Sequence, residues 1–217
     1  MKNKNVVVIG CGTGTYTVLS GLKKYPLNLT AIVSMADDGG SNRVIRDEFG
    51  LLPTSDIRQC FVALAEENGE TEKLMRQLFM YRFHQGAGID GMTFGNLFMA
   101  ALADIMGSQK DAIEQTGKIL KIKGEVIPTT LDNTKLGAVY ENGARLVGEH
   151  LIDEPKHDGA LKITKLFLEP MAKANSRALE AIGNADIIIL GPGELYTSTI
   201  ANLIVGGVSS ALQKTKA

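Results

Sequence analysis

The chain has 217 residues, with 23 Lys and Arg against 24 Asp and Glu, so its formal net charge is −1. This balance argues against a broad electrostatic surface for DNA or RNA, and no apolar run approaches the roughly 18 residues of a membrane span. A hydrophobic fraction of 44% is ample for a buried core and excludes a disordered chain. Two cysteines, Cys11 and Cys60, make no disulfide framework, so a reducing cytoplasm is the expected location.

The beginning of the chain alternates between strand and helix patterns. Asn5–Ile9 and Thr30–Met35 are predicted as buried strands, and Thr15–Lys24 between them has its apolar residues at helical spacing. Such a strand–helix–strand unit of about 30 residues predicts the opening of a parallel α/β sheet. Ala36–Ser41, after the second strand, has the composition of a loop.

The middle of the chain predicts a helical insertion. Its helices are expected at Asp56–Glu66, Thr71–Tyr81, Asn96–Met106 and Ser108–Leu120. Asn96–Met106 is apolar nearly all round, so we expect it to be buried. Ser108 and Asp111 resemble a capping box at the start of the last of these helices.

After Leu120, the spacing of apolar residues changes from the helical period to the pattern of strands. Strands are predicted at Glu125–Thr129, Leu136–Tyr140, Arg145–Ile152 and Leu161–Leu168, with a hairpin turn at Asn142-Gly143. The pattern ends with a helix at Ala174–Ile182, a buried strand at Asp186–Leu190 and a helical tail at Ile200–Lys214. The sequence therefore predicts one α/β domain over residues 1–217, with a mainly parallel sheet, a helical insertion in the middle and a late β-hairpin.

The first glycine-rich turn is a candidate phosphate site. It lies between the first strand and the first helix, where glycine amides and a helix N-terminus favour an anion. Its candidate ligand-binding residues are Gly10, Gly12, Thr13 and Gly14. The dinucleotide fingerprint needs a glycine where this chain has Thr15, and no Walker-type Lys-Ser/Thr follows. A tight turn without a ligand is the alternative, but its position after the first strand favours phosphate binding.

Two carboxylates follow the second predicted strand. Asp37 and Asp38 lie at its carboxyl end, where they could hold a ribose hydroxyl or coordinate Mg²⁺, or form only a solvated turn and N-cap. Arg43 and Arg46 follow one helical turn apart. They could pair with a phosphate or with the acidic residues that come next, and the sequence does not decide between these.

A second glycine-rich loop follows the last buried strand and carries three hydroxyl groups. Its candidate ligand-binding residues are Gly191, Gly193, Tyr196, Thr197 and Ser198. Such a loop can hold a phosphate or a sugar, and a turn punctuated by Pro192 is the alternative. Asn96 is either a helix N-cap or a ligand contact, and spacing alone favours the cap.

Six motifs, in this order and spacing, resemble the CofD-like and YvcK-like (UPF0052) superfamily. They are Val7–Gly14, Ala31–Ser41, Asp56–Leu64, Tyr81–Phe83, Gly95–Leu97 and Gly191–Ser198. The Ala-Asp-Asp-Gly-Gly-Ser and Gly-Pro-Gly-x-Leu-Tyr-Thr-Ser motifs point to the YvcK branch, the gluconeogenesis factors, more than to the 2-phospho-L-lactate transferase branch.

The resemblance implies a Rossmann-like three-layer fold and a cytosolic protein that binds a UDP-sugar, notably UDP-N-acetylglucosamine. It also implies a regulatory role in carbon metabolism and cell shape, with no cofactor required. Carried over by position, it places nucleotide or phosphate contacts at Gly12, Thr13 and Gly14. Asp37, Asp38, Asn96 and the Gly191–Ser198 loop would line the same cleft.

The transferase branch gives an alternative from another class. Its members move a phospholactyl group onto a deazaflavin with Mg²⁺, and the resemblance would then place the metal at Asp37 and Asp38. An NAD(P)-binding protein is a third interpretation, disfavoured by Thr15 in the fingerprint. Whether the protein is an enzyme at all is left open, because the sequence shows no nucleophile–base pair.

The chain departs from the family pattern at four positions: Cys11 and Ser55 replace glycines, Met92 replaces a histidine, and Glu194 replaces a serine. A carboxylate at Glu194 would repel a phosphate in the second loop. Family members also usually continue well beyond this chain's last residues. We therefore expect an exposed apolar surface where that part would pack, including the segment Ala201–Leu212, and hence a homo-oligomer.

Overall fold

The computed structural model describes residues 3–155 and 160–217, and its centre is a parallel sheet of four strands. The strand order is β3-β2-β1-β7, formed by β1 (Lys4–Gly10), β2 (Leu27–Val33), β3 (Glu125–Pro128) and β7 (Ile187–Leu190). The register pairs Val8 of β1 with Ala31 of β2 and Ile189 of β7. All four carboxyl ends therefore meet at one edge of the sheet.

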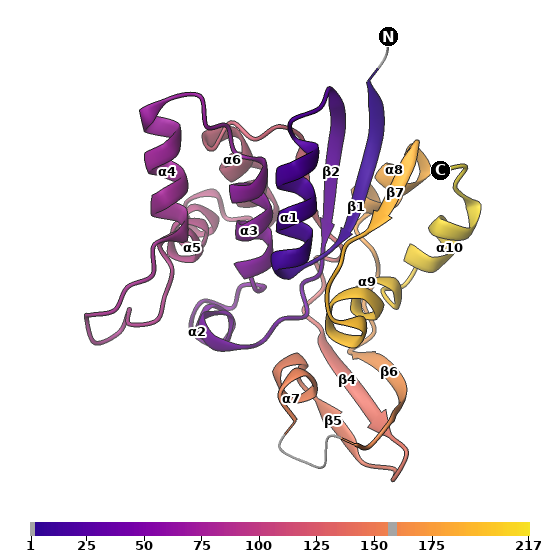
Figure 1. Cartoon of the computed structure of the whole chain (residues 1–217). Coiled ribbons are helices and arrows are strands. Elements are labelled where there is room, and N and C mark those ends of the chain that lie inside the picture. Colours follow the sequence, from indigo (N-terminus) through magenta and orange to yellow (C-terminus); the bar gives the residue numbers. More distant parts are fainter. Residues whose placement is uncertain (1–2, 156–159) are drawn as a thin grey trace.

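Helices cover both faces of this sheet, which gives three layers (Figure 1). On one face, α1 (Gly12–Leu22) and α3 (Ser55–Leu64) pack on β1 and β2 through side chains such as Leu19 and Phe61. On the other face lie α8 (Ser176–Gly183) and α10 (Val208–Lys214). The predicted three-layer α/β fold with a mainly parallel sheet is confirmed.

The predicted helical insertion lies between β2 and β3. It consists of α2 (Gly40–Phe49), α3, α4 (Glu70–Met80), α5 (Phe94–Met106) and α6 (Gln109–Ile119). Ser108 caps α6 by accepting a hydrogen bond from the Asp111 amide at 3.2 Å. The expectation that α5 is buried all round is wrong, because Ile105 is 79% exposed. In the described part of the chain, no helix is long and apolar enough to cross a membrane.

A small antiparallel sheet lies beyond the carboxyl edge of the main sheet (Figure 1). Its order is β5-β4-β6, with β4 (Lys135–Tyr140), β5 (Arg145–Val147) and β6 (Ile163–Glu169). The predicted hairpin turn is confirmed between β4 and β5. The predicted strand Arg145–Ile152 is wrong in its second half, where α7 (Glu149–Asp153) begins after Gly148, whose φ is +133°.

The tail is helical, as predicted, but it is broken into pieces. The π-helix η1 (Leu195–Ile200) runs into α9 (Ala201–Leu203), and Gly207, at φ +105°, separates this helix from α10. Val205 and Val208 are buried against the same chain, so the tail does not form the exposed apolar surface expected of it. An exposed apolar edge instead lies on β7, where Ile187 is 42% and Leu190 is 49% exposed.

Candidate functional site

The turn between β1 and α1 lies at the carboxyl edge of the sheet. Helix α1 begins at Gly12, whose φ is +66° and beside which a side chain would meet nothing within 4 Å. The first amides of a helix have no intrahelical acceptor. The backbone amide of Gly12 donates a hydrogen bond to the Asp56 carboxylate at 3.0 Å. The next residue, Thr13, is exposed. One amide of this candidate anion site is thus already bonded to the protein's own carboxylate.

Close packing of the two glycine-rich loops explains several of their glycines. A Cβ on Gly14 would lie 1.7 Å from the carbonyl oxygen of Pro192. Cβ atoms on Gly10 and Gly191 would lie 2.4 and 2.6 Å from the hydroxyl of Thr15, which is fully buried. These three glycines let the loops touch, so their presence does not itself require a ligand.

The second loop turns into η1 at the same edge. Tyr196 is 39% exposed, whereas Thr197 is only 5% exposed and so lies inside the protein. The carbonyl of Glu194 accepts the amides of Ser198 and Thr199 at 3.1 and 3.0 Å, and this holds the turn. Of the predicted hydroxyl-bearing residues, Tyr196 and the half-buried Ser198 are therefore open to solvent, and Thr197 is not.

Asp37 and Asp38 lie at the end of β2, as predicted, and both accept hydrogen bonds from the protein. The two oxygens of Asp37 accept from the Gly39 amide at 2.9 Å and from the Asn42 side chain at 2.6 Å. Asp38 Oδ1 accepts from the His150 amide at 2.9 Å and so caps α7 of the small sheet. These carboxylates organise the loop between β2 and α2, and Asp38 links that loop to α7.

Two further carboxylates, which the sequence did not single out, complete an acidic cluster. Burial, and secondarily Asp37, raises the pKa of Asp56 to about 7 and that of Glu149 to about 8. Burial also raises the pKa of Asp37. Asp56 begins one of the family-like motifs, which was a usable signal. Glu149 had none, because its segment was predicted as a strand.

The N-cap interpretation of Asn96 is wrong. Thr93 is the N-cap of α5, since its hydroxyl accepts from the Asn96 amide at 3.4 Å. The Asn96 side chain is fully buried and donates to the hydroxyls of Ser41 and Ser55 at 3.2 and 3.1 Å. Its Oδ1 has no hydrogen-bond partner among the described residues.

The two arginines of α2 differ in position. Arg43 is exposed, whereas Arg46 is half-buried and donates from Nη2 to the carbonyl oxygen of Thr134 at 3.0 Å. Burial lowers the pKa of Arg46, and the charges of Asp38 and Asp37 oppose that shift. Arg46 therefore lies within electrostatic reach of Asp37 and Asp38, and ligand binding by Arg43 stays a prediction.

The other departures from the family pattern are used in packing. The buried Cys11 thiol hydrogen bonds with Asp56 and Ser198, and burial raises its pKa. Ser55 links Asn42 to Asn96 through its hydroxyl. Met92 is 2% exposed and belongs to the apolar cluster around Ile45.

The Mg²⁺ site that the transferase alternative places at Asp37 and Asp38 stays a prediction. Within residues 3–155 and 160–217, no three His, Cys, Asp or Glu side chains are placed to hold a metal ion. Both oxygens of Asp37 already accept protein hydrogen bonds, as does one of Asp38. Each carboxylate oxygen has a second lone pair, so these hydrogen bonds leave acceptor sites for a ligand hydroxyl or a cation.

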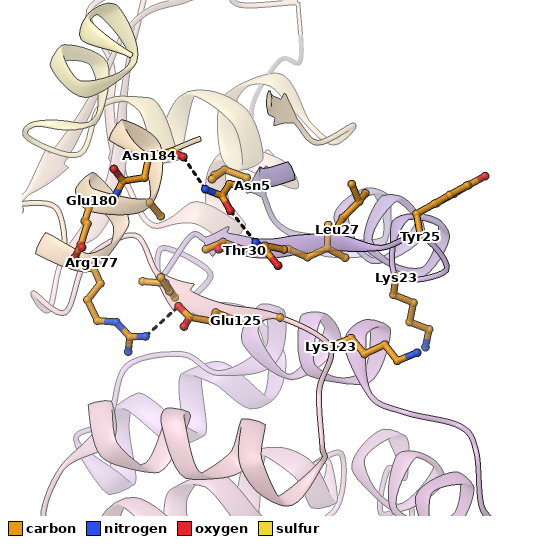
Figure 2. Close-up of a pocket in the computed structure, with 16 residues that line it drawn as sticks. Asn5, Lys23, Tyr25, Leu27, Thr30, Lys123, Glu125, Arg177, Glu180 and Asn184 are labelled. Atoms are coloured by element: carbon orange, nitrogen blue, oxygen red, sulfur yellow. Dashed lines mark hydrogen bonds and ion pairs between the residues drawn. The ribbon is translucent and has the colours of Figure 1, made fainter. Parts of the chain in front are cut away.

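The structure also holds a pocket away from this edge. A pocket of about 720 Å³ is lined by the opposite, amino-terminal part of β1, β2 and β3 and by α8 (Figure 2). None of the predicted site residues lines it. The candidate site is therefore formed by the loops at the carboxyl edge and is separate from this pocket.

A doubly wound parallel sheet with two glycine loops at its carboxyl edge defines a Rossmann-like α/β protein. The comparisons name the family more closely. A family model described as 2-phospho-L-lactate transferase CofD matches residues 6–217. The chain belongs to this family, and the resemblance seen in its motifs is confirmed.

Its relatives are longer proteins. One named gluconeogenesis factor from Halalkalibacterium halodurans is 42% identical over this whole chain, which covers 65% of the relative. Another of that name from Listeria innocua is 42% identical and is covered to 64%. The chain spans 46% to 66% of the length of the curated relatives it matches. A crystal structure of a UPF0052 protein from Bacillus halodurans superposes with a TM-score of 0.92 at 40% identity, covering all of this chain and 67% of the other.

Proposed function

We propose that the protein binds a nucleotide sugar of the UDP-N-acetylglucosamine type at the carboxyl edge and acts as a cytoplasmic regulatory protein. The observation that carries this proposal is the open first turn of α1 beside the carboxylates of β2. The diphosphate takes the amides of Thr13 and Gly14, where the helix dipole favours an anion. Ribose or sugar hydroxyls donate to Asp37 and Asp38.

A binding role suits this edge better than nucleophilic catalysis. The thiol nearest the turn, Cys11, is held protonated by burial and by the Asp56 charge, which disfavours a thiolate nucleophile. The name gluconeogenesis factor in the relatives supports a role in carbon metabolism. A role in cell shape belongs to the same proposal and rests on the family resemblance alone.

A transferase of the 2-phospho-L-lactate type is the second candidate. The description of the family model favours it, because that model matches nearly the whole chain. The arrangement of Asp37 and Asp38 adds no support of its own, because in the described part of the chain these carboxylates belong to no group of three metal-ligating side chains.

Calorimetric titration with UDP-N-acetylglucosamine, with and without EDTA, separates the two candidates. A hydrogen bond to a charged group contributes about 1.5–3 kcal/mol, so Asp38→Asn should weaken binding about 10–150-fold, and EDTA should not. Asp47→Asn, an exposed carboxylate on α2, is the matched control, and circular dichroism checks that the cap on α7 survives. Strictly Mg²⁺-dependent binding, or phospholactyl transfer to a deazaflavin by the wild type, would favour the enzyme.

A further inference from the structure

The face of the main sheet that carries α8 is apolar toward the carboxyl ends of the strands and polar toward their amino ends. Its row nearest the carboxyl end is apolar: Ile9, Ile32 and Ile127 are register partners in the core. The next row places Val7 beside Thr30 and Glu125, and the last pairs Asn5 with Asn28. Both faces of a parallel sheet are normally covered and apolar. These polar rows therefore form an unusual floor.

Two other parts of the protein border these polar rows and enclose a pocket. One wall is α8, with Arg177, Glu180 and Asn184, and the other is formed by the turn after α1 and the segment before β3 (Figure 2). The cavity volume of about 720 Å³ falls within the roughly 300–1,000 Å³ of small-molecule sites.

The floor is preorganised by side-chain hydrogen bonds. Asn28 donates to Asn5 Oδ1 at 2.9 Å, and Asn5 donates to the carbonyl oxygen of Asn184 at 3.1 Å. This chain of hydrogen bonds ties β2 to β1 and to the end of α8. It fixes the orientation of both amides, as a binding surface requires.

Most of the charge around the pocket is neutralised internally. Lys23 pairs with Glu67 at 2.9 Å, and Arg177 pairs with Glu125 at 3.0 Å and with Glu114. In the described part of the chain, five polar lining side chains form no hydrogen bond or ion pair: those of Tyr25, Thr30, Lys123, Glu180 and Asn184. What faces the cavity is thus a phenol, a hydroxyl, amides, one cation and one anion.

We propose that this amino-edge pocket binds an uncharged polyhydroxylated molecule of mono- or disaccharide size. Sugar hydroxyls both donate and accept, which matches amides, hydroxyls and a balanced pair of charges. A phosphorylated or acidic ligand would meet the carboxylates of Glu125 and Glu180 as well as the lining cations, so the balanced charges give it no net attraction. An apolar ligand would leave the floor amides without partners. The ring of Tyr25, 64% exposed at the rim, offers a sugar an apolar surface.

Titration of isotopically labelled protein with maltose, followed by amide chemical shifts, tests this assignment. Saturable shifts are expected in 5–7, 28–30, 123–127 and 177–184. Thr30→Val keeps the side-chain shape and removes one hydroxyl, and Glu180→Ala removes the free anion. Thr30→Val should weaken binding about two- to tenfold, the usual contribution of one neutral hydrogen bond, and Glu180→Ala about 10–150-fold, because its carboxylate is charged.

Two controls share the chemistry of these variants but lie outside the pocket. Thr164→Val changes a strand threonine of β6, and Glu48→Ala changes an exposed glutamate of α2, so neither should alter maltose affinity. Saturable shifts that both pocket variants leave unchanged, or no shifts at all, would overturn the proposal. Tighter binding of glucose 6-phosphate than of glucose would overturn the uncharged class. Thr30→Val should leave UDP-N-acetylglucosamine binding unchanged, so this proposal and the one above fail separately.

Discussion

Substitutions of three glycines of α1, Gly12, Gly14 and Gly21, test whether the two glycine-rich loops pack against each other. In Gly14→Ala, the new Cβ would fall 1.7 Å from the backbone oxygen of Pro192, so one loop must move. Overpacking typically costs about 1–3 kcal/mol, and a clash this deep with backbone belongs at the upper end. We expect about 3 kcal/mol less stability, which lowers the melting temperature by roughly 6–12 °C in a chain of this size.

The other two glycines are internal controls. A side chain at Gly12 meets nothing, but its φ of +66° is a left-handed conformation, so Gly12→Ala should cost about 1–2 kcal/mol. Gly21 also has open space and no positive φ, so Gly21→Ala should stabilise the helix by about 0.5–1 kcal/mol.

Urea unfolding followed by circular dichroism measures all three variants against the wild type. The expected order of stability is Gly21→Ala, wild type, Gly12→Ala and then Gly14→Ala. Near-wild-type stability of Gly14→Ala would show that the two loops do not touch, and the packing explanation of the loop glycines would fail with it.

Three further predictions concern the acids, the sheet edge and a cap. Burial raises the pKa of Asp56 from 3.8 to about 7. Between these two pH values the native state holds a proton that the unfolded chain has lost. The contribution of Asp56 to stability therefore falls as pH rises from about 4 to about 7. Asp56→Asn should reduce that fall in urea unfolding between pH 5 and 8, and an unchanged slope would contradict this. The exposed edge of β7 should make the chain self-associate, and Ile187→Lys or Leu190→Lys should reverse this in sedimentation velocity; a wild-type monomer at every concentration would refute it. Ser108→Ala should cost about 1 kcal/mol in thermal unfolding, because the cap to Asp111 is lost; an unchanged midpoint would contradict the cap.

The order of helices and strands could be predicted from local sequence patterns. The prediction errors occur where contacts between residues far apart in the sequence determine the local structure. Strand β1, helix α1 and strand β2 were predictable because buried apolar runs and helical spacing are local properties. The end of β5 was not. There, the backbone of Gly148 and the capping of His150 by Asp38, more than 100 residues away in sequence, start a helix instead. No local pattern carries that information.

The site shows the same division. The positions of Asp37 and the first glycine turn followed from the rule that loops at strand carboxyl ends meet. Their partners did not, because hydrogen bonds such as that from Gly12 to Asp56 join separate helices. Asn96 is instructive: its place at a helix start suggested a cap, yet a threonine three residues earlier fills that role.

The carboxyl edge combines a helix N-terminus, which favours anions, with the carboxylates of Asp37 and Asp38, which repel them. Two further acids, Asp56 and Glu149, carry less charge near pH 7 because burial raises their pKa values. Asp56 accepts the hydrogen bond of the first amide of α1, so it occupies a position that a bound anion could otherwise take. A ligand made only of phosphate would meet the remaining repulsion with little compensation. A ligand that carries phosphate at one end and hydroxyl donors at the other satisfies both halves, since the hydroxyls reach Asp37 and Asp38 while the phosphate stays at Thr13 and Gly14. The electrostatics of the edge therefore favour the nucleotide-sugar proposal over simple phosphate binding.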